Sequence, residues 1–329
     1  MTQYDLVGIG NAVVDVISKA DDNFLELMGI EKGIMQLVER ERGEVLYAAM
    51  DGRVQTPGGS VANTIAGAGA LGLKTAFIGR VHDDALGRFY AGAMLDHGIA
   101  FPNAPVPGGE LPTSRSMIFV SPDGERSMNT YLGISSEVSS DDVPEAVAAN
   151  AKIMFLEGYL FDKDKGKTAF MEAARACKSS GGRAGIAISD PFCVERHRAD
   201  FLRLIGDELD YVIGNEAEIK SLFETNDLEE ALNKTAQLCP LVVCTRSGDG
   251  VTVLSNEGRV DVPVDQVVPV DATGAGDQFA AGFLFGLAQG KDMETCARMG
   301  HVAGGEVIGH IGPRPQADVA ELMRGKGLL

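Results

Sequence analysis

The feature that most constrains the fold of this chain is a regular alternation of short apolar segments with longer, helix-like ones. Continuous apolar strands that alternate with helices are typical of a mainly parallel sheet covered on both faces. The sequence therefore predicts an α/β fold. The expected strands are residues 4–10, 74–79, 152–158, 183–190, 211–215, 241–247 and 250–255, and the expected helices include 60–72, 84–97, 166–180, 216–223 and 229–238.

Two segments depart from this alternation, residues 11–39 and about 99–133. In "TSRSMIFVS" and "RSMNTYL" apolar and polar positions alternate, which suits strands with one buried face and one face in solvent. "SPDG" at 121–124 is typical of a turn between two such strands. Since no linker or internal repeat interrupts the chain, we expect residues 1–329 to form one domain. The two insertions would pair as a small β lid over the sheet edge where open α/β sheets bind ligands.

The charge balance excludes several classes of partner. The chain has 47 acidic and 29 basic residues and a net charge of −18. Such a surface repels phosphate backbones and anionic membranes, so neither nucleic acid nor a membrane is an expected partner. No apolar segment approaches the ~18–20 residues of a membrane span. The N-terminus "MTQYDLVGIG" lacks the basic region of a signal peptide, so we expect a cytoplasmic protein.

The cysteines do not indicate a metal site. None of the five has a CxxC partner, and two of them flank an apolar segment that we expect to be a buried strand. Free thiols that act as small apolar side chains fit this pattern better than zinc ligands. The five are Cys177, Cys193, Cys239, Cys244 and Cys296.

Three glycine-rich segments resemble nucleotide-binding motifs only in part. "GIGNAV" at 8–13 follows a strand but lacks the third glycine of a dinucleotide site, which disfavours a nicotinamide dehydrogenase. "GAGALG" at 67–72 has the letters GxGxxG but lies inside an expected helix. "GKT" at 166–168 lacks the first glycine of a phosphate loop, because Phe161 occupies that position. Packing or chance explains "GAGALG" and "GKT" better.

The segment "VDATGAGDQF" at 270–279 is more informative. It leads from an extended stretch into a helix whose apolar stripe includes Phe279 and Phe283. Gly274, Ala275 and Gly276 would place N–H groups at the start of that helix, which is a site for an anion. Asp277 would repel a phosphate there, unless it accepts the proton of a hydroxyl that attacks the phosphate. Stabilisation of the helix start is the alternative, and this segment alone does not decide between them.

With these segments considered together, the chain resembles the ribokinase/PfkB family of sugar and nucleoside kinases. "DATGAGD" at 271–277 fits the family's D-x-x-G-A-G-D motif. Four further segments resemble family motifs in family order: "PGGSVANTIAGAGALG" (57–72), "NEAE" (215–218), "TRSGDGV" (245–251) and "GHVAGG" (300–305). The resemblance covers nearly the whole chain. It implies a ribokinase-like three-layer sandwich with a mainly parallel central sheet and a small β lid.

The resemblance also implies an ATP-dependent phosphotransferase and assigns roles to its residues. Asp277 would be the catalytic base, Gly274, Ala275 and Gly276 the anion hole, and Arg126 a lid residue that folds over the phosphates. Glu218 would organise Mg²⁺ through water, while Asp271 and Thr273 would help to hold a monovalent cation such as K⁺. The residues implied to border ATP are Asn215, Thr245, Arg246, Ser247, Gly248, Asp249, Gly250 and His301.

The family's acceptor-binding positions fall on Asp15, Gly58, Gly59 and Asn63. Carboxylate and amide groups suit adjacent hydroxyls of a sugar. A helix cap at Asn63 and a turn at Gly59 are the structural alternatives. Asp15 is the hardest to explain structurally, because it interrupts the apolar run "AVVDVI".

The identity of the acceptor stays open at this stage. "GNAVVD", "GERSMNTYLG" and "SDPF" resemble adenosine kinases, with Phe192 near the purine and Met128 and Leu132 as apolar walls. These features favour the 5′-hydroxyl of adenosine or a related nucleoside. Glu157, however, lies where ribokinases have an acidic sugar contact. The alternatives are a ribokinase-like, fructokinase-like or 2-keto-3-deoxygluconate-type sugar kinase and a non-catalytic nucleoside-binding relative. For any of these functions we expect the protein to be a monomer or a homodimer.

Overall fold

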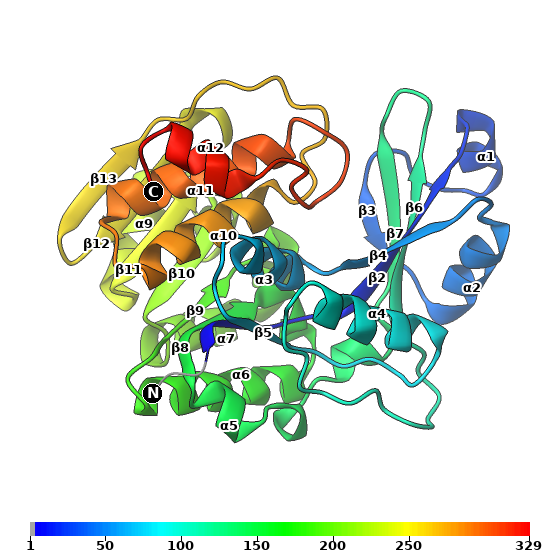
Figure 1. The fold of residues 1–329 in the computed structure, drawn as a ribbon, viewed down its shortest axis with the longest axis horizontal. Helices are drawn as coiled ribbons and strands as arrows, with labels where there is room; N and C mark the ends of the chain where they lie inside the picture. Colours follow the sequence, from blue (N-terminus) through cyan, green and yellow to red (C-terminus); the bar gives the residue numbers. More distant parts are fainter. Residues whose placement is uncertain (1–3) are drawn as a thin grey trace.

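The computed structural model describes residues 4–329 and contains a central sheet of eight strands in the order β13-β12-β11-β10-β9-β8-β1-β5 (Figure 1). The strands from β5 to β11 are parallel, and β12 and β13 are antiparallel additions at one edge. All seven predicted strands are present, so the predicted α/β class is confirmed. The bounds are β1 (Tyr4–Ile9), β5 (Thr75–Ile78), β8 (Ala151–Glu157), β9 (Arg183–Ala187), β10 (Tyr211–Asn215), β11 (Leu241–Thr245), β12 (Val251–Ser255) and β13 (Gly258–Val262).

Helices cover both faces of this sheet, because its strands are apolar on both sides. Along β1, Leu6 packs into one core and Val7 into the other, as the alternation of side chains in a strand requires. The first core includes residues of α3 (Ser60–Ala70), α4 (Ala85–Asp96), α10 (Ala275–Ala288), α11 (Met293–Val307) and α12 (Val319–Gly325). The second includes residues of α5 (Glu145–Ala148), α6 (Asp164–Ser179), α7 (Pro191–Asp207), α8 (Glu216–Ser221) and α9 (Leu228–Leu238).

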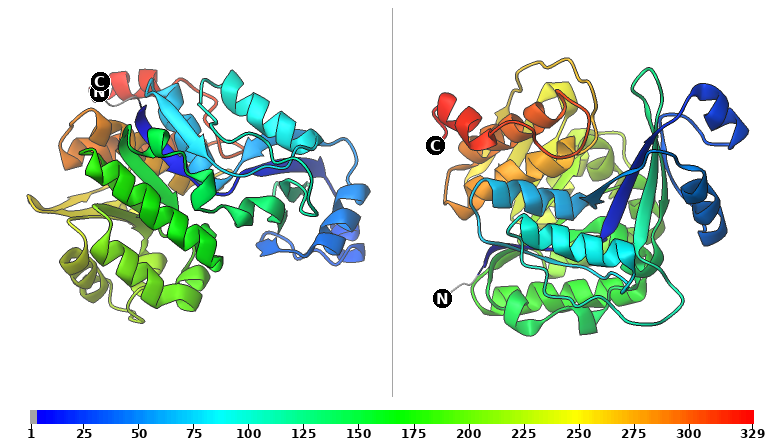
Figure 2. Two further views of the ribbon diagram at one scale, coloured as in Figure 1. Left: turned by 90° about the horizontal axis from the view of Figure 1, so that it is seen from below. Right: turned by 45° about the vertical axis from the view of Figure 1, so that its right-hand side comes forward.

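A second sheet of five strands, in the order β3-β7-β6-β2-β4, lies to one side of the first (Figures 1 and 2). Its strands are β2 (Val13–Lys19), β3 (Met35–Leu37), β4 (Val54–Gly58), β6 (Ser114–Val120) and β7 (Arg126–Tyr131). The turn expected at 121–124 joins β6 to β7, where the Gly124 N–H donates to the Ser121 carbonyl oxygen at 2.9 Å.

The second sheet is more buried than the alternating pattern indicates. Leu25 of α1 (Asp22–Leu27) and Leu46 of α2 (Arg40–Ala49) share a core with Val14, Val16 and Met117, so helices cover one face. The opposite face lines a cavity rather than open solvent. The first segment of this sheet also continues to Gly58, beyond residue 39, because β4 pairs with β2. The short, proline-containing "VQTPG" carries little strand signal.

The structure also bears on the expectations for the cysteines and for membranes. All five cysteines are buried and free, and burial raises the pKa of each thiol to about 12. They act as small apolar side chains, as predicted. Among residues 4–329, no helix combines the length and apolar character that crossing a membrane requires.

Candidate active site

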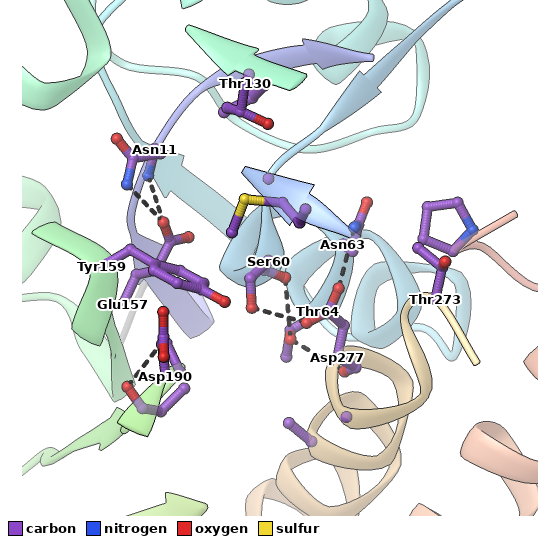
Figure 3. Close-up of a pocket in the computed structure, with 18 of the residues that line it drawn as sticks. Asn11, Ser60, Asn63, Thr64, Thr130, Glu157, Tyr159, Asp190, Thr273 and Asp277 are labelled. Carbon is purple, nitrogen blue, oxygen red and sulfur yellow. Dashed lines mark hydrogen bonds between the residues drawn. The ribbon is translucent and has the colours of Figure 1, made fainter. Parts of the chain in front are cut away.

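A cavity of about 550 Å³ lies between the second sheet and the carboxyl ends of the central strands (Figure 3). It gathers side chains from distant parts of the chain, because parallel strands end at the same edge of a sheet. The predicted site residues that line it are Asp15, Gly59, Asn63, Met128, Leu132, Glu157, Phe192, Asn215, Glu218, Thr245, Thr273, Gly276 and Asp277. Those that do not line it are Gly58, Arg126, Arg246, Ser247, Gly248, Asp249, Gly250, Asp271, Gly274, Ala275 and His301.

The N-terminus of α10 opens toward this cavity at Gly276. The helix begins after Gly274, which has φ +80°, and a Cβ there would lie 2.6 Å from Cα of Pro313, so only glycine fits. The Ala275 N–H differs from the prediction, since it donates to the Ala272 carbonyl oxygen at 3.2 Å. In the described residues, the N–H groups of Gly274, Gly276 and Asp277 have no acceptor. These three amides and the helix dipole suit an anion.

The Asp277 carboxylate points away from its own helix terminus and toward α3 (Figure 3). Oδ1 accepts a hydrogen bond from Ser60 Oγ at 2.7 Å, and Oδ2 accepts one from Asn63 Nδ2 at 3.0 Å. An acid that merely stabilised the start of α10 would instead accept from N–H groups of that helix. Burial raises the pKa of Asp277 to about 6, against the opposing effect of these two donors and of Arg314. The group is therefore ionised at neutral pH and fixed in orientation.

Helix α3 begins after Gly59, which has φ +101°. A carboxylate from β8 accepts a hydrogen bond from a free N–H group at this helix N-terminus. Glu157 Oε2 accepts from the Val61 N–H at 3.0 Å, while Oε1 accepts from Asn11 N at 3.1 Å and Asn11 Nδ2 at 2.8 Å. Burial raises the pKa of Glu157 to about 7. Only 1% of Glu157 is exposed. Both Glu157 oxygens thus accept hydrogen bonds from N–H groups of the protein, whereas the position of Glu157 in ribokinases implied a contact with the sugar.

Asp15 on β2 differs from Glu157 in having no partner. It is 7% exposed, lines the cavity, and accepts no hydrogen bond through its side chain from residues 4–329. Burial raises its pKa to about 6, while Arg126 and Arg314 oppose that shift. A Cβ on Gly58 would lie 2.5 Å from this carboxyl group, which explains the glycine at that position. The Asp15 oxygens are free to accept hydrogen bonds from hydroxyl groups of a ligand.

Apolar side chains form a wall of the same cavity. Met128 and Leu132, which the sequence analysis selected, are joined there by Met35 and Leu37 of β3. Phe192 lies at the start of α7 on the cavity's rim and is 68% exposed. This wall stands beside the polar groups Asp15 and Asn63, so the cavity can bind a ligand with one apolar and one hydroxylated part.

The segment "NEAE" forms a capping box at the start of α8. Glu218 Oε2 accepts from Asn215 N at 2.9 Å, and Oε1 accepts from Asn215 Nδ2 at 2.7 Å. Burial, together with the Asp190 carboxylate, raises the pKa of Glu218 to about 7. The described residues contain no cluster of three or more metal-ligating side chains. Mg²⁺ needs no such cage, since one or two carboxylates, water and phosphate oxygens hold it; Glu218 and Asp190 fit that arrangement.

Of the remaining predicted nucleotide residues, all but Thr245 lie outside the cavity. Thr245 lines it, but the 246–250 turn closes on itself, with Arg246 N donating to the Gly250 carbonyl oxygen at 2.8 Å. His301 packs against Phe279, with 5.6 Å between ring centroids, and burial lowers its pKa to about 4. The 246–250 turn and His301 therefore do not line the cavity.

Arg126 was expected over the phosphates, but it pairs with Asp271. Its Nη1 donates to Asp271 Oδ2 at 2.9 Å, and both side chains are buried. Asp271 also accepts from Gly312 N and Thr273 N, each at 2.9 Å. Residue 126 begins β7, so this ion pair ties the second sheet to the loop before α10. In this structure Arg126 is thus buried in an ion pair and does not line the cavity.

Several residues at the site carried no clear signal in the sequence. Ser60 follows Gly59 and is three positions from Asn63, a spacing that places both on one face of α3 and could have revealed it. Asn11, Tyr159 and Asp190 also line the cavity. Asn11 and Asp190 lie in "GNAVVD" and "SDPF", two segments that resemble adenosine kinases, but the sequence analysis assigned neither residue a role. Arg314 lies between two prolines, where no pattern indicates a role.

Comparison with known proteins agrees with this geometry. The model for the pfkB family of carbohydrate kinases, which as a family use ATP and Mg²⁺, matches residues 26–319. The structure of adenosine kinase from Sinorhizobium meliloti is 44% identical, with TM-score 0.90 over 98% of this chain and 99% of that one. A "probable sugar kinase protein" from Rhizobium etli is 42% identical, with TM-score 0.91 and full coverage of both chains. The 5-dehydro-2-deoxygluconokinase of Halalkalibacterium halodurans is 26% identical over 76% of this chain and 79% of its own. The predicted ribokinase-like fold and kinase family are confirmed, and this chain belongs to the pfkB family of carbohydrate kinases.

Proposed function

We propose that this kinase transfers the γ-phosphoryl group of MgATP to the 5′-hydroxyl of adenosine or a closely related nucleoside. One observation carries this choice of acceptor. The unpartnered Asp15 carboxylate and the apolar wall of Met35, Leu37, Met128 and Leu132 line the same cavity as Asp277. A nucleoside has a ribose diol that can donate hydrogen bonds to the Asp15 carboxylate and a base that can pack against the apolar wall. The 44% identity to an adenosine kinase supports the same choice.

In this proposal the residues act mainly by positioning and by charge. Asp277 accepts the proton of the attacking hydroxyl, and the free N–H groups at the start of α10 bind the phosphoryl oxygens as charge moves onto them. Asp15 accepts hydrogen bonds from the ribose hydroxyls, while Asn63 holds Asp277 in place. The second sheet acts as a lid that excludes water.

The nucleotide would occupy the carboxyl ends of β10 and β11. Thr245, the 246–250 turn and His301 would border its ribose and adenine. Glu218 and Asp190 would hold Mg²⁺ through water, and that ion would neutralise phosphate charge. The acids that line the cavity are Asp15, Glu157, Asp162, Asp190, Glu218 and Asp277. ATP therefore needs its cation and the α10 amides to enter so acidic a site.

A monovalent cation is not part of this proposal. Thr273 N, Arg126 and Gly312 N already donate to the two Asp271 oxygens, and the guanidinium balances the charge. These residues do not fit a site for K⁺ at that carboxylate. We expect equal turnover in potassium and tetramethylammonium chloride at matched ionic strength, measured by ADP release. A strict requirement for K⁺ would contradict this expectation.

A sugar kinase is the second candidate, since 5-dehydro-2-deoxygluconokinases are among the proteins similar in sequence to this chain.

Acceptor-dependent release of ADP tests the proposal. The panel should contain adenosine, other nucleosides, ribose, fructose, 2-keto-3-deoxygluconate and 5-dehydro-2-deoxygluconate, each with MgATP. We expect the highest kcat/KM with adenosine. A higher kcat/KM with any free sugar or sugar acid would replace the nucleoside by that acceptor. ADP release that no acceptor stimulates would exclude a kinase of these substrates altogether.

A further inference from the structure

Arg314 lies in the loop between α11 and α12, which the proposed function does not use. Pro313 and Pro315 flank it and restrict the backbone. Gln278 Nε2 donates to the Pro313 carbonyl oxygen at 3.0 Å and to the Asn63 carbonyl oxygen at 3.1 Å. Since Gln278 directly follows Asp277, one side chain ties this loop, α3 and the first turn of α10 together. Arg314 is thereby held at a fixed distance from the site.

The guanidinium of Arg314 is unusually situated. Its Nε donates to Asn63 Oδ1 at 3.3 Å, while its Nη2 is buried and has no partner among the described residues. Burial lowers the pKa of Arg314, and the acids Asp15 and Asp277 oppose that change. A buried cation is costly unless nearby charges compensate it. The compensating charges here are two carboxylates of the proposed active site.

Asn63 lies between Arg314 and Asp277. Its Oδ1 accepts from Arg314, and its Nδ2 donates to Asp277 Oδ2 at 3.0 Å. A carboxamide can rotate so that its oxygen and nitrogen exchange places, but a guanidinium has only donors. An arginine on one side therefore selects the orientation in which nitrogen faces the carboxylate. In the opposite orientation, Asn63 Oδ1 would face Asp277 and repel it.

We propose that Arg314 is a positioning residue for phosphoryl transfer, which orients the Asn63 carboxamide and through it the Asp277 carboxylate. This inference rests on the proposed role of Asp277 as the base. Arg314 need not touch either substrate. It sets the geometry of the base through Asn63, and its charge favours the ionised form of Asp277.

The charged surroundings of Asp277 predict how this role can be detected. Arg314 from the C-terminal loop is the cation that lowers the pKa of Asp277. Asp15 from β2, Glu157 from β8 and Tyr159 after β8 are the other titratable groups that interact with it. Removal of the Arg314 charge leaves acids and a phenol around Asp277. The midpoint of its titration should then move to higher pH.

The test compares Arg314→Met, which removes charge and donors at similar length, with Arg314→Lys, which keeps the charge. Arg298→Met is the matched control, since Arg298 is an exposed arginine on α11. With the best acceptor, we expect Arg314→Met to lower kcat by about 10- to 100-fold. The acid limb of kcat/KM should move up by about one pH unit. Arg314→Lys should keep the wild-type limb and recover part of kcat.

A double-mutant cycle with Asn63→Ala identifies the route of the effect. Once no amide remains to be oriented, Arg314→Met should cost much less in kcat than it does in the wild type. Full additivity would overturn the proposal. So would wild-type kcat and pH dependence in Arg314→Met, or a loss of kcat that only accompanies a lower Tm with the acid limb unmoved.

Failure of this inference is distinguishable from failure of the proposed function. The Asn63 side-chain amide signal in NMR, followed against pH without substrate, reports the titration of Asp277 in the free protein. We expect its midpoint to rise in Arg314→Met and to stay in Arg314→Lys; an unchanged midpoint in both would contradict the inference. Wild-type turnover in Asp277→Asn would instead contradict the proposed function.

Discussion

The N-termini of α3 and α10 meet at Asp277, and they use the same device in different ways. Each helix begins after a glycine of positive φ, Gly59 or Gly274, and neither glycine can cap it with a side chain. The terminus of α3 receives the Glu157 carboxylate, which accepts from Val61 N at 3.0 Å. The terminus of α10 keeps free N–H groups at the cavity. The same positive helix end is thus closed by protein in one case and open to a ligand in the other.

Helices away from this junction show how a terminus is normally closed. An aspartate caps each of α4, α9, α11 and α12, through Asp84, Asp227, Asp292 and Asp318. These helix N-termini lie outside the cavity, so their capped N–H groups are not needed to bind a ligand. The open end of α10 leaves backbone donors unsatisfied in the absence of a ligand. Uncompensated donors beside a fixed carboxylate are what the transfer of a phosphoryl group requires.

The largest effect is expected at the open terminus. Asp277→Asn keeps the shape of the side chain but removes its ability to accept a proton. We expect kcat to fall by about 10²- to 10⁴-fold while ATP still binds. Rates of ADP release and titration of nucleotide binding by calorimetry measure the two effects. Asp207→Asn on the exposed end of α7 is the matched control. Comparable turnover in Asp277→Asn and wild type would show that Asp277 is not the base.

The next effect concerns the protonation state of that base. Since only ionised Asp277 can accept the proton and burial raises its pKa to about 6, kcat/KM should fall as pH drops through about 6. Ser60→Ala removes a donor that lowers this pKa, so the acid limb should move to higher pH, with kcat reduced about tenfold.

Thr64→Val is the control for Ser60→Ala, because Thr64 Oγ1 donates to the backbone oxygen of Asp277 and not to its carboxylate. Its acid limb should stay where it is in the wild type. Equal displacement of the limb in both variants would show that the position of α3, rather than the Ser60 hydroxyl, is responsible.

The smallest effect on catalysis is expected at the closed terminus. Glu157→Gln places an amide among three N–H donors, so at least one buried donor loses its partner. We expect the free energy of unfolding to fall by about 1–3 kcal/mol at pH 7.5, measured by urea denaturation, with acceptor KM nearly unchanged. Glu257→Gln in an exposed turn is the control. A large rise in acceptor KM without loss of stability would instead make Glu157 a direct substrate contact.

Much of this architecture was predictable from local patterns, and the contacts within the site were not. Apolar runs and glycine-rich turns are local signals, so the central strands and the start of α10 followed from them. The pairing of Asn11 with Glu157 joins residues 146 positions apart, and that of Asn63 with Asp277 joins residues 214 apart. Side-chain chemistry at one position does not specify such partners. The family resemblance implied a place for Arg126 over the phosphates, but it did not indicate the ion pair with Asp271.

A structure of the protein with bound adenosine and a non-hydrolysable ATP analogue tests the central claim most directly. We expect terminal phosphate oxygens within hydrogen-bonding distance of the Gly274, Gly276 and Asp277 amides, and the acceptor hydroxyl against the Asp277 carboxylate. A terminal phosphate bound elsewhere, with those amides still without an anion and Asp277 held only by α3, would contradict it.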